Sequence, residues 1–374
     1  MTMTTLQHIP DVRFADETTW ATHGAEWPSG ETRRIECCAV RNETHDVKTF
    51  VFRCADFTAL AFEPGQFITI SPQIDGKIVS RCYTLSSSPT RPFNFCITVK
   101  RVPGGEVSNW LHDNLHPGST LAASGPAGSF TPVGLPTGKL LYLSAGSGIT
   151  PLMAMARAAY DLAANLDIVF VHSARSPADI IFRDELAQMQ AQQSRFRVLA
   201  VCEAKGDEAD WQGPTGRLDL AVLSTQVPDF LEREVFTCGP QGYMSATRGV
   251  LEKAGFDVAH YHQESFDINA LAAETAPPVA PTSAPSETNF TVTLAKSGKT
   301  FSVSPSQTLL AAAKKAGAVV PSSCSQGVCG TCKTAVLQGE VDMQHNGGIR
   351  QREIDKGLRL LCCSRPTSDL VLDL

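Results

Sequence analysis

Residues 321–332 read PSSCSQGVCGTC, and a further pair of cysteines, Cys362-Cys363, follows thirty residues on. Within the first stretch, Cys324, Cys329 and Cys332 have the C-x4-C-x2-C spacing typical of one kind of [2Fe–2S] cluster. That cluster needs a fourth cysteine far downstream, and the pair at 362–363 supplies it. The stretch therefore predicts a metal centre in the last part of the chain.

The chemistry of this loop suits iron and sulfide. Ferric iron bridged by sulfide binds thiolates, and a short loop can wrap the cluster and direct backbone N–H groups at its sulfurs. Gly327 and Gly330 fit that need because a Cβ would obstruct the close approach. A zinc site and a set of buried free thiols are the alternatives. Zinc sites usually use paired C-x2-C knuckles, and the chain has one such pair here.

Length and composition limit the kind of protein that carries this metal centre. A chain of 374 residues suits two or three domains, and its 43% hydrophobic and 19% charged content is typical of a soluble globular protein. The first twenty residues lack a signal-peptide pattern, and no apolar run is long enough for a membrane span, so we expect a cytoplasmic protein with no membrane contact. The twelve cysteines are then expected to be mostly reduced. A net charge of −6 argues against binding to nucleic acid.

Changes in composition and residue pattern along the sequence predict a multidomain protein. Short β-rich runs separated by turns predict an antiparallel β-barrel, and strands alternating with helical patterns then predict an α/β, doubly wound domain. Prolines among Ala, Ser and Thr predict an extended linker. A hairpin, a short helix and the cysteine loop predict a small α+β domain. The expected boundaries are an N-terminal extension at 1–30, the barrel at 31–135, the doubly wound domain at 136–268, the linker at 269–286 and the cysteine-rich domain at 287–374.

A flavin site is predicted by the stretch RCYTLS at 81–86. Arg81 can clamp a phosphate, the ring of Tyr83 can stack on a planar isoalloxazine, and the hydroxyl of Thr84 can reach the polar edge of a flavin. Taken alone, the motif is also compatible with an ordinary strand surface. The stretch VKRVPGGEVSNWLHD at 99–113 strengthens the prediction of a flavin site. In it two glycines precede a predicted helix start, with Ser108 near its cap, and such a helix start suits a pyrophosphate. We expect further flavin-cofactor contacts from Ser86, Val99, Lys100, Gly105, Val107 and Ser108.

A nicotinamide site is predicted where the first parallel strand gives way to a helix, at SAGSGITP, residues 144–151. The pattern is G-x-G-x-x-P, which departs from the G-x-G-x-x-G of an ordinary dinucleotide-binding domain. Pro151 suits the first helical turn, where its missing N–H has no cost. The expected cofactor contacts are Gly146, Gly148 and Thr150.

Two further strand ends belong to the same predicted site. Thr237-Cys238-Gly239-Pro240 ends a later strand, and Cys238 is either close to the nicotinamide or an inert core thiol. The strand DIVFVHSARS ends in Ser173 and Arg175, where many NAD proteins carry an acid for the ribose. Arg175 could hold the 2′-phosphate of NADPH or stack on adenine. His172 is expected to be a strand-end residue rather than a catalyst.

Together these motifs resemble known families. Residues 287–374 look like a plant-type ferredoxin domain of β-grasp fold, and Leu360-Leu361-Cys362 matches the context of the fourth ligand, so the resemblance favours Cys362 over Cys363. PGQF at 64–67, RCYTLS and GPAGSF at 125–130 resemble the ferredoxin–NADP reductase superfamily. That likeness implies FAD rather than FMN in the barrel. It also implies that SAGSGITP and Thr237–Pro240 hold NADH or NADPH.

The same resemblance implies which side chains lie at the reacting centre. Thr84 and Cys238 are expected next to the flavin and the nicotinamide. HQESF at 262–266 is either a segment that brings Glu264 to the flavin or an ordinary sheet strand.

The overall order of motifs resembles the reductase components of two-component Rieske-type oxygenases, with the greatest likeness to glycine betaine and stachydrine demethylase reductases. This implies that NAD(P)H gives two electrons as hydride to the flavin, which releases them singly to the cluster and on to a partner oxygenase. Related oxygenase reductases often use NADH, which favours that coenzyme. The alternatives are a reductase for another acceptor, such as a diiron hydroxylase, a hybrid-cluster protein or a quinone, and a redox-sensing iron–sulfur module.

Overall fold

The computed structural model describes residues 27, 31–56, 58–135, 138–266, 289–318, 320, 327, 330, 332–345, 349 and 351–374. The predicted N-terminal extension, apart from Trp27, and the predicted linker lie outside the described residues. The chain divides into two compact units: residues 1–126 with 130–262, and residues 127–129 with 263–374. Each unit is described by itself below.

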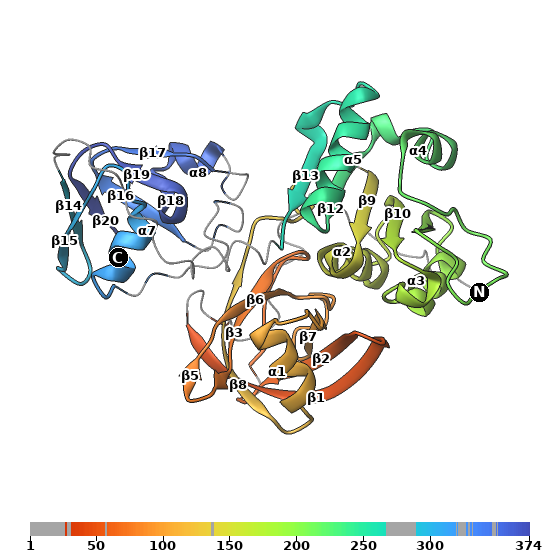
Figure 1. Ribbon diagram of the computed structural model, residues 1–374, viewed down its shortest axis with the longest axis horizontal. Coiled ribbons are helices and arrows are strands. Elements are labelled where there is room, and N and C mark those ends of the chain that lie inside the picture. Colours follow the sequence, from red (N-terminus) through yellow and green to blue (C-terminus); the bar gives the residue numbers. More distant parts are fainter. Residues whose placement is uncertain are drawn as a thin grey trace, which may run out of the picture. The chain divides into compact units, whose positions relative to one another are not determined.

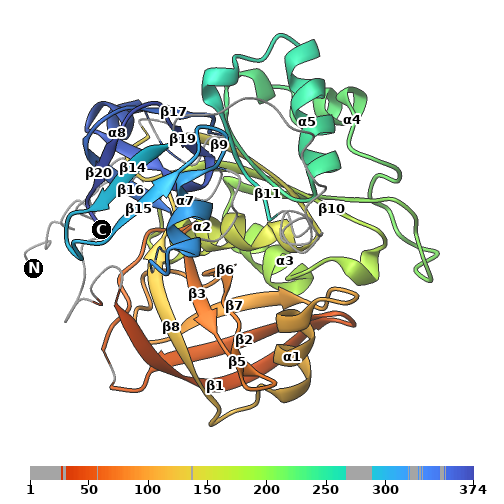
Figure 2. The ribbon, with the colours of Figure 1, turned by 60° about the vertical axis from the view of Figure 1, so that its left-hand side comes forward.

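The first part of the first unit is an antiparallel sheet of six strands in the order β6-β3-β8-β1-β2-β7. Alternate residues of β2 are buried, as Phe50 and Phe52 show, because one face of the sheet encloses the core. An antiparallel bridge between Leu85 and Ile97 joins the regions of the two edge strands and closes the sheet. The predicted barrel is confirmed, and Figure 2 shows it with α1 alongside. Its elements are β1 (Thr32–Thr44), β2 (Val47–Cys54), β3 (Phe67–Ser71), the small hairpin β4 (Gln73–Ile74) and β5 (Lys77–Ile78), β6 (Arg81–Thr84), β7 (Phe95–Lys100), α1 (Glu106–Asn114) and β8 (Thr120–Ala127).

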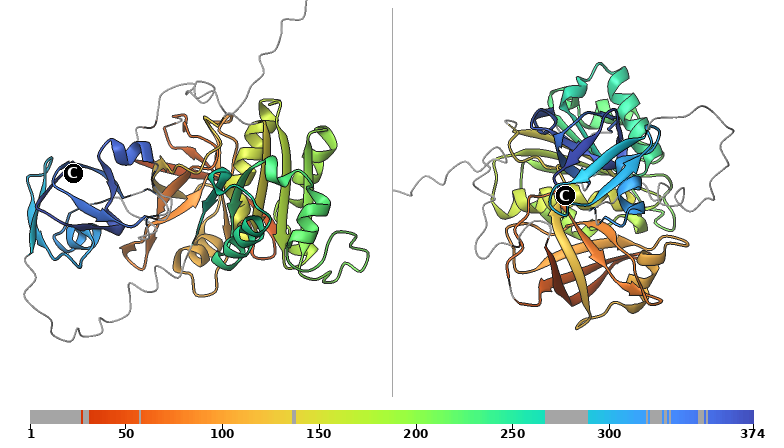
Figure 3. Two further views of the ribbon diagram at one scale, coloured as in Figure 1. Left: turned by 90° about the horizontal axis from the view of Figure 1, so that it is seen from above. Right: turned by 90° about the vertical axis from the view of Figure 1, so that its left-hand side faces the viewer.

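The second part of this unit is a five-stranded sheet in the order β11-β10-β9-β12-β13. The pairs β11–β10, β10–β9 and β9–β12 are parallel, so the predicted doubly wound sheet is confirmed. Helices lie on both sides of this sheet, as Figure 3 shows. The elements are β9 (Lys139–Ala145), α2 (Ile149–Asp161), β10 (Asp167–Ala174), α3 (Arg183–Gln192), β11 (Phe196–Cys202), α4 (Leu220–Gln226), β12 (Glu234–Cys238), α5 (Gln241–Lys253) and β13 (Tyr261–Glu264).

The second unit contains a five-stranded sheet in the order β15-β14-β20-β16-β18 (Figure 1). The hairpin β14–β15, the helix α7 and the final strand β20 confirm the elements expected there. Parallel pairing of β14 with β20, beside antiparallel neighbours, gives the mixed sheet of a β-grasp domain. The elements are β14 (Phe290–Leu294), β15 (Thr300–Val303), α7 (Leu309–Lys315), β16 (Lys333–Gln338), β17 (Val341–Met343), α8 (Gln351–Asp355), β18 (Leu358–Leu360), β19 (Ser364–Pro366) and β20 (Leu370–Leu372).

Candidate cofactor sites

The predicted flavin motif forms β6, which pairs with β3. Arg81 and Tyr83 are two residues apart on this strand and so share a face, as a phosphate clamp and a stacking ring require. Burial raises the pKa of the Tyr83 phenol, which keeps the ring neutral. The placement suits the predicted roles of both residues.

Thr84 provides the test of whether a flavin fits. Its side chain is buried at the end of β6, and its Oγ1 has no hydrogen-bond partner among the described residues. A buried hydroxyl without a partner costs free energy, typically about 1–3 kcal/mol, unless a ligand supplies the missing group. The polar edge of an isoalloxazine can supply it. Ser86, in contrast, is already satisfied, because its Oγ lies 2.9 Å from Thr98 Oγ1.

The helix α1 begins at the predicted pyrophosphate site, with Gly105 as its N-cap and no side chain bound to its first amides. Ser108 lies near the cap, as expected, and its side chain does not bond to the first amides of the helix. Its Oγ accepts from the backbone N–H of Val102 and donates to the Gly105 carbonyl, which leaves the amides of the first turn available. Gly105 has no room for a side chain, since a Cβ would lie 2.6 Å from Ser108 Oγ.

The remaining flavin-cofactor predictions fall on β7 and α1. The side chains of Val99 and Val107 belong to the barrel core, so any contact they make with a cofactor must come from their backbones. Lys100 lies at the end of β7, and its Nζ is 3.2 Å from Asp46 Oδ2.

The predicted nicotinamide residues gather at the carboxyl ends of three neighbouring strands, where ligands of doubly wound sheets bind. Ser173 of β10 is in register with Ala145 of β9, and Cys238 of β12 is in register with Ser144. The turn Gly146–Gly148 follows β9 directly and leads into α2. Residues far apart in sequence are thereby brought together as predicted.

The contact between the glycine turn and Cys238 is unusually close. A Cβ on Gly148 would lie 2.3 Å from the Cys238 carbonyl oxygen and 2.5 Å from the Gly239 nitrogen. No side chain caps α2 at Gly148 or α5 at Pro240, and within the glycine turn the Ile149 N–H donates to the Gly146 and Ser147 carbonyls. Thr150 does not bind the first amides of α2, because its Oγ1 donates back to the Ser147 carbonyl. The edge therefore offers the N–H groups and the space that a pyrophosphate needs.

Arg175 follows β10 and is held by two carboxylates. Its Nη2 lies 2.9 Å from Asp179 Oδ1 and 3.4 Å from Asp46 Oδ2. His172 is fully buried in β10, where its Nδ1 is 2.8 Å from Ser144 Oγ. Burial lowers the pKa of His172 to about 3, so the ring is neutral, in accord with the expectation of a strand residue rather than a catalyst.

HQESF forms the strand β13 up to Glu264, so the segment is a sheet strand. The Glu264 side chain is buried. Its approach to the flavin stays a prediction.

Two of the four predicted cluster ligands, Cys332 and Cys362, are described, and they lie together. The Cys362 backbone N–H donates to Cys332 Sγ at 3.4 Å, and the Gly327 N–H donates to Cys362 Sγ at 3.2 Å. Backbone amides thus point at the sulfurs, as expected around a [2Fe–2S] cluster. Gly327 has φ +71°, and a Cβ there would lie 2.7 Å from Cys363 Sγ, which explains the glycine. Cys324 and Cys329 lie outside the described residues.

Cys363 is turned toward the protein backbone, with its Sγ 3.6 Å from the Leu360 carbonyl oxygen. Its neighbour Cys362 is the one that receives an amide of the cysteine loop, so the geometry favours Cys362 as the fourth ligand.

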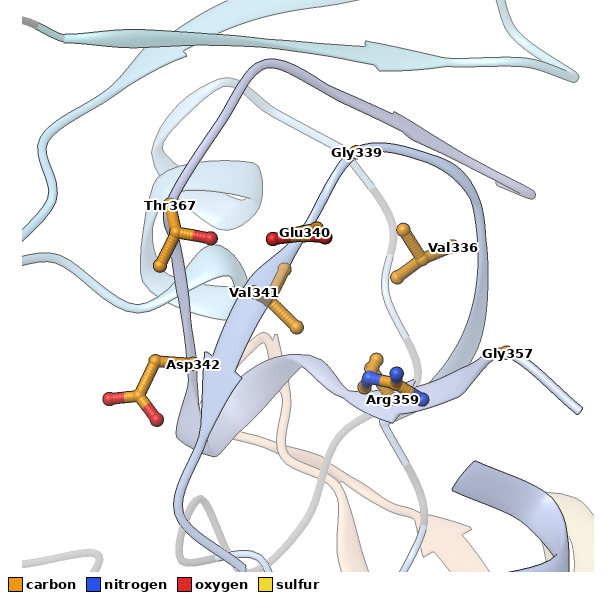
Figure 4. A pocket seen from close by; sticks show the side chains of 8 residues that line it. All are labelled: Val336, Gly339, Glu340, Val341, Asp342, Gly357, Arg359 and Thr367. Atoms are coloured by element: carbon orange, nitrogen blue, oxygen red, sulfur yellow. The ribbon is translucent and has the colours of Figure 1, made fainter. Parts of the chain in front are cut away.

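A hollow of about 440 Å³ lies elsewhere in this domain (Figure 4). It contains none of the predicted site residues, and Val336 of β16 is among the residues that line it. We assign no cofactor to it. Its lining residues are Val336, Gly339, Glu340, Val341, Asp342, Gly357, Arg359 and Thr367.

One residue at the flavin site was missed by the sequence reasoning. Arg157 of α2 donates to the carbonyl of Ser86, two residues beyond the flavin strand. The signal was present, since Arg157 is a single charge within the apolar stretch PLMAMARAAY.

The folds and sites define a flavin- and iron–sulfur-dependent NAD(P)H oxidoreductase. Three family models match in chain order: the oxidoreductase FAD-binding domain at 36–131, the oxidoreductase NAD-binding domain at 142–249 and the 2Fe-2S iron-sulfur cluster binding domain at 292–367. The chain belongs to the family of monooxygenase reductase subunits with these three domains. FAD, NAD(P)H and a [2Fe–2S] cluster are its cofactors, and they carry electrons from the nicotinamide through the flavin to the cluster.

Individual relatives are similar over more than nine-tenths of this chain. The glycine betaine monooxygenase reductase subunit of Pseudomonas aeruginosa is 46% identical over 357 residues, covering 93% of this chain and 96% of the relative. The stachydrine N-demethylase reductase subunit of Rhizobium meliloti is 41% identical, covering 91% and 95%. The solved structure of phthalate dioxygenase reductase is 27% identical with a TM-score of 0.55, covering 92% of this chain and 98% of that one. Within the described part of this chain, every helix is too short or too polar to cross a bilayer.

Proposed function

We propose that this chain is the reductase component that supplies electrons to a separate Rieske-type oxygenase, which N-demethylates a quaternary ammonium compound such as glycine betaine or stachydrine. The observation that carries the proposal is the graded similarity of full-length relatives. Identity is 46% to a glycine betaine monooxygenase reductase subunit and 41% to a stachydrine N-demethylase reductase subunit. It falls to 33% for a 3-ketosteroid-9-alpha-monooxygenase reductase component of Mycolicibacterium smegmatis, although coverage stays at 90% of this chain.

The arrangement of metal-ligating side chains supports a separate acceptor. Among the described residues, one group of three side chains that could hold a metal comes together, formed by His45, Asp46 and Asp179. Lys100 and Arg175 form ion pairs with its carboxylates, so the group is already neutralised. Oxygen-activating iron bound by two histidines and a carboxylate would need a different set.

The coenzyme that fits this proposal best is NADH. A 2′-phosphate of NADPH would need the Arg175 guanidinium, and that guanidinium is held by Asp46 and Asp179. The phosphate would compete with two carboxylates and be repelled by them. NADH carries no charge at that position and avoids this cost.

The test is coupled turnover with purified oxygenase components. The reductase is mixed with a glycine betaine oxygenase component or, in parallel, with a 3-ketosteroid oxygenase component, each with its own substrate. Hydroxylation of an N-methyl group releases formaldehyde, so we expect formaldehyde to form in proportion to NADH oxidised with the first partner. A Cys362→Ser variant is the control, since it keeps the flavin but lacks a cluster ligand. Equal or faster support of the steroid oxygenase would contradict the proposal.

A further inference from the structure

One face of α2 connects the nicotinamide domain to the segment that follows the flavin strand. Arg157 and Asp161 are four residues apart and so lie one above the other on this helix. Each bonds to a residue of the loop between β6 and β7, and all of these residues belong to the same compact unit. We name these two residues the α2 clamp.

Arg157 makes the more buried contact of the clamp. Its side chain is only 12% exposed, and its Nη1 donates to the Ser86 carbonyl at 2.5 Å. Its Nε and Nη2 donate to the two carboxylate oxygens of Glu185 at 2.7 and 2.6 Å. The guanidinium also lies over the ring of Phe182, 4.6 Å from its centroid. A planar guanidinium held on three sides has little freedom to move.

The acceptor of this bond is itself fixed to the barrel. The Ser86 N–H donates to the Cys96 carbonyl at 2.8 Å, and its Oγ bonds to Thr98 Oγ1. Ser86 stands two residues after Thr84, the hydroxyl that we assign to the flavin edge. A displacement of Arg157 is therefore passed to the strand that carries the flavin residues.

Asp161 makes the second contact of the clamp. Its Oδ2 accepts from Thr90 Oγ1 at 2.6 Å and from Arg91 Nε at 3.1 Å, and its Oδ1 accepts from Arg91 Nη2 at 2.7 Å. Two points of attachment on one helix face resist rotation of the helix as well as sliding.

The other end of α2 is the nicotinamide site. Arg157 lies eight residues after Ile149, which corresponds to about 12 Å along a helix. The helix therefore acts as a rigid spacer between the glycine turn and Ser86. We propose that Arg157, supported by Asp161, is a positioning residue that sets the distance between the nicotinamide and the flavin for hydride transfer. The inference rests on the flavin and nicotinamide chemistry of the family and is independent of which oxygenase accepts the electrons.

The experiment measures flavin reduction by NADH in stopped flow for Arg157→Ala, Arg157→Lys and the wild-type holoprotein. Misplacement of reacting groups by about 1 Å can cost ~10²-fold in rate. We expect Arg157→Ala to lower the rate constant at saturating NADH by about 10- to 100-fold. The FAD content and the dissociation constant for NADH should stay within about twofold, because the contacts of Arg157, to Ser86, Glu185 and Phe182, hold protein groups together. Lysine can still donate to the Ser86 carbonyl, so Arg157→Lys should recover part of the rate.

A second readout does not depend on turnover. Hydrogen–deuterium exchange of the backbone amides from Ser86 to Arg91 should rise in Arg157→Ala, since the carbonyl anchor of that loop is gone. The matched control is Arg183→Ala. Arg183 also makes a two-pronged ion pair, with Glu208 at 2.6 and 2.9 Å, and lies over an aromatic ring, that of Trp211, yet these contacts stay within the nicotinamide domain.

A wild-type reduction rate in Arg157→Ala, or an equal loss in Arg183→Ala, would overturn the positioning role. A lower melting temperature with an unchanged rate constant would do the same, because that result describes structural support alone. If Arg157→Ala does not fold, Asp161→Asn is measured instead, and its rate should also fall; an unchanged rate in that variant refutes the clamp.

Discussion

Replacing Gly148 with alanine tests the nicotinamide site most directly. The added Cβ would lie 2.3 Å from the Cys238 carbonyl oxygen, 2.4 Å from its carbon and 2.5 Å from the Gly239 nitrogen. All three are backbone atoms, so no side chain can rotate away. Ordinary contact begins at 3.4 Å, and the glycine turn and the end of β12 must therefore separate by about 1 Å.

This separation falls between the two segments that we expect to hold the nicotinamide. Overpacking of this kind costs about 1–3 kcal/mol of stability, and a displacement of ~1 Å at reacting groups costs on the order of 10²-fold in rate. Gly148 has φ −64°, so the penalty comes from contact and not from backbone strain. We expect flavin reduction by NADH to slow by about 100-fold while the bound FAD and the cluster absorbance remain.

The assay is stopped-flow absorbance of the flavin after mixing with NADH, with the melting temperature measured alongside. Gly249→Ala is the control, because Gly249 lies in the later part of α5, away from its first turn, with no atom within 4 Å of an added Cβ. Alanine in a helix is favoured over glycine by up to about 1 kcal/mol, so this control should be neutral or slightly stabilising. A Gly148→Ala protein that reduces its flavin at the wild-type rate would refute the assignment of this turn to the coenzyme.

Three other predictions test the remaining sites. Cys362→Ser should remove the visible absorbance of the cluster and leave flavin reduction intact, whereas Cys363→Ser should keep both; the reverse pattern would make Cys363 the ligand. Asp179→Asn should raise kcat/KM with NADPH by about 5- to 10-fold and change kcat/KM with NADH by less than twofold. The substitution removes one of the negative charges that oppose a 2′-phosphate beside Arg175. No gain with NADPH would contradict the assignment of NADH as the coenzyme. Glu234→Gln should destabilise the fold most between about pH 4.5 and 6.5, as measured by urea unfolding at several pH values, and less in more acidic and in more alkaline solution. Although burial opposes the change, hydrogen bonds from His262 and His260 lower the pKa of Glu234, so the stability that Glu234 contributes is lost as pH falls through that lowered pKa. The bond to Glu234 raises the pKa of His260, so the stability that His260 contributes is lost as pH rises through that raised pKa. A cost of the substitution that is independent of pH would exclude this account.

The fold was predictable from the sequence where the spacing of motifs and the periodicity of apolar residues follow directly from helix and strand geometry. The alternation of strands and helices after residue 138 identified the parallel sheet, and the register of Ser144 with Cys238 is a detail that the structure adds. The strand β11 and the helix α4 were not assigned from the sequence. β11 is an edge strand with mixed burial, so its side chains lack the continuous apolar run of its buried neighbours.

The contacts between the barrel and the nicotinamide domain could not be read in advance. Arg157 and Ser86 are separated by 71 residues, and Arg175 and Asp46 by 129, so local patterns carry no information about their pairing. The bonds of Ser108, near the start of α1, could not be read in advance for a related reason. A serine near a helix start can bond either to the helix amides or to other backbone groups, and here the Val102 N–H and the Gly105 carbonyl take its hydroxyl.

The predicted dinucleotide sites share one feature, which is the way in which their helices begin. Away from the sites, α4 is capped by Asp219 and α7 by Thr308, each accepting from an amide of the first turn. The helices that start at the predicted sites begin instead at Gly105, Gly148 and Pro240, with no side chain on their first amides. The helix α3 also lacks a side-chain cap, and acidic side chains complement the dipole in the first turn of both α3 and α1. A glycine cap costs a helix only about a few tenths of a kcal/mol relative to Ser, Thr, Asp or Asn, and it leaves N–H groups that a phosphate can take. A bound dinucleotide would take these N–H groups and stabilise the starts of the three helices. Loss of FAD or NADH should therefore loosen α1, α2 and α5 before it affects α4 or α7.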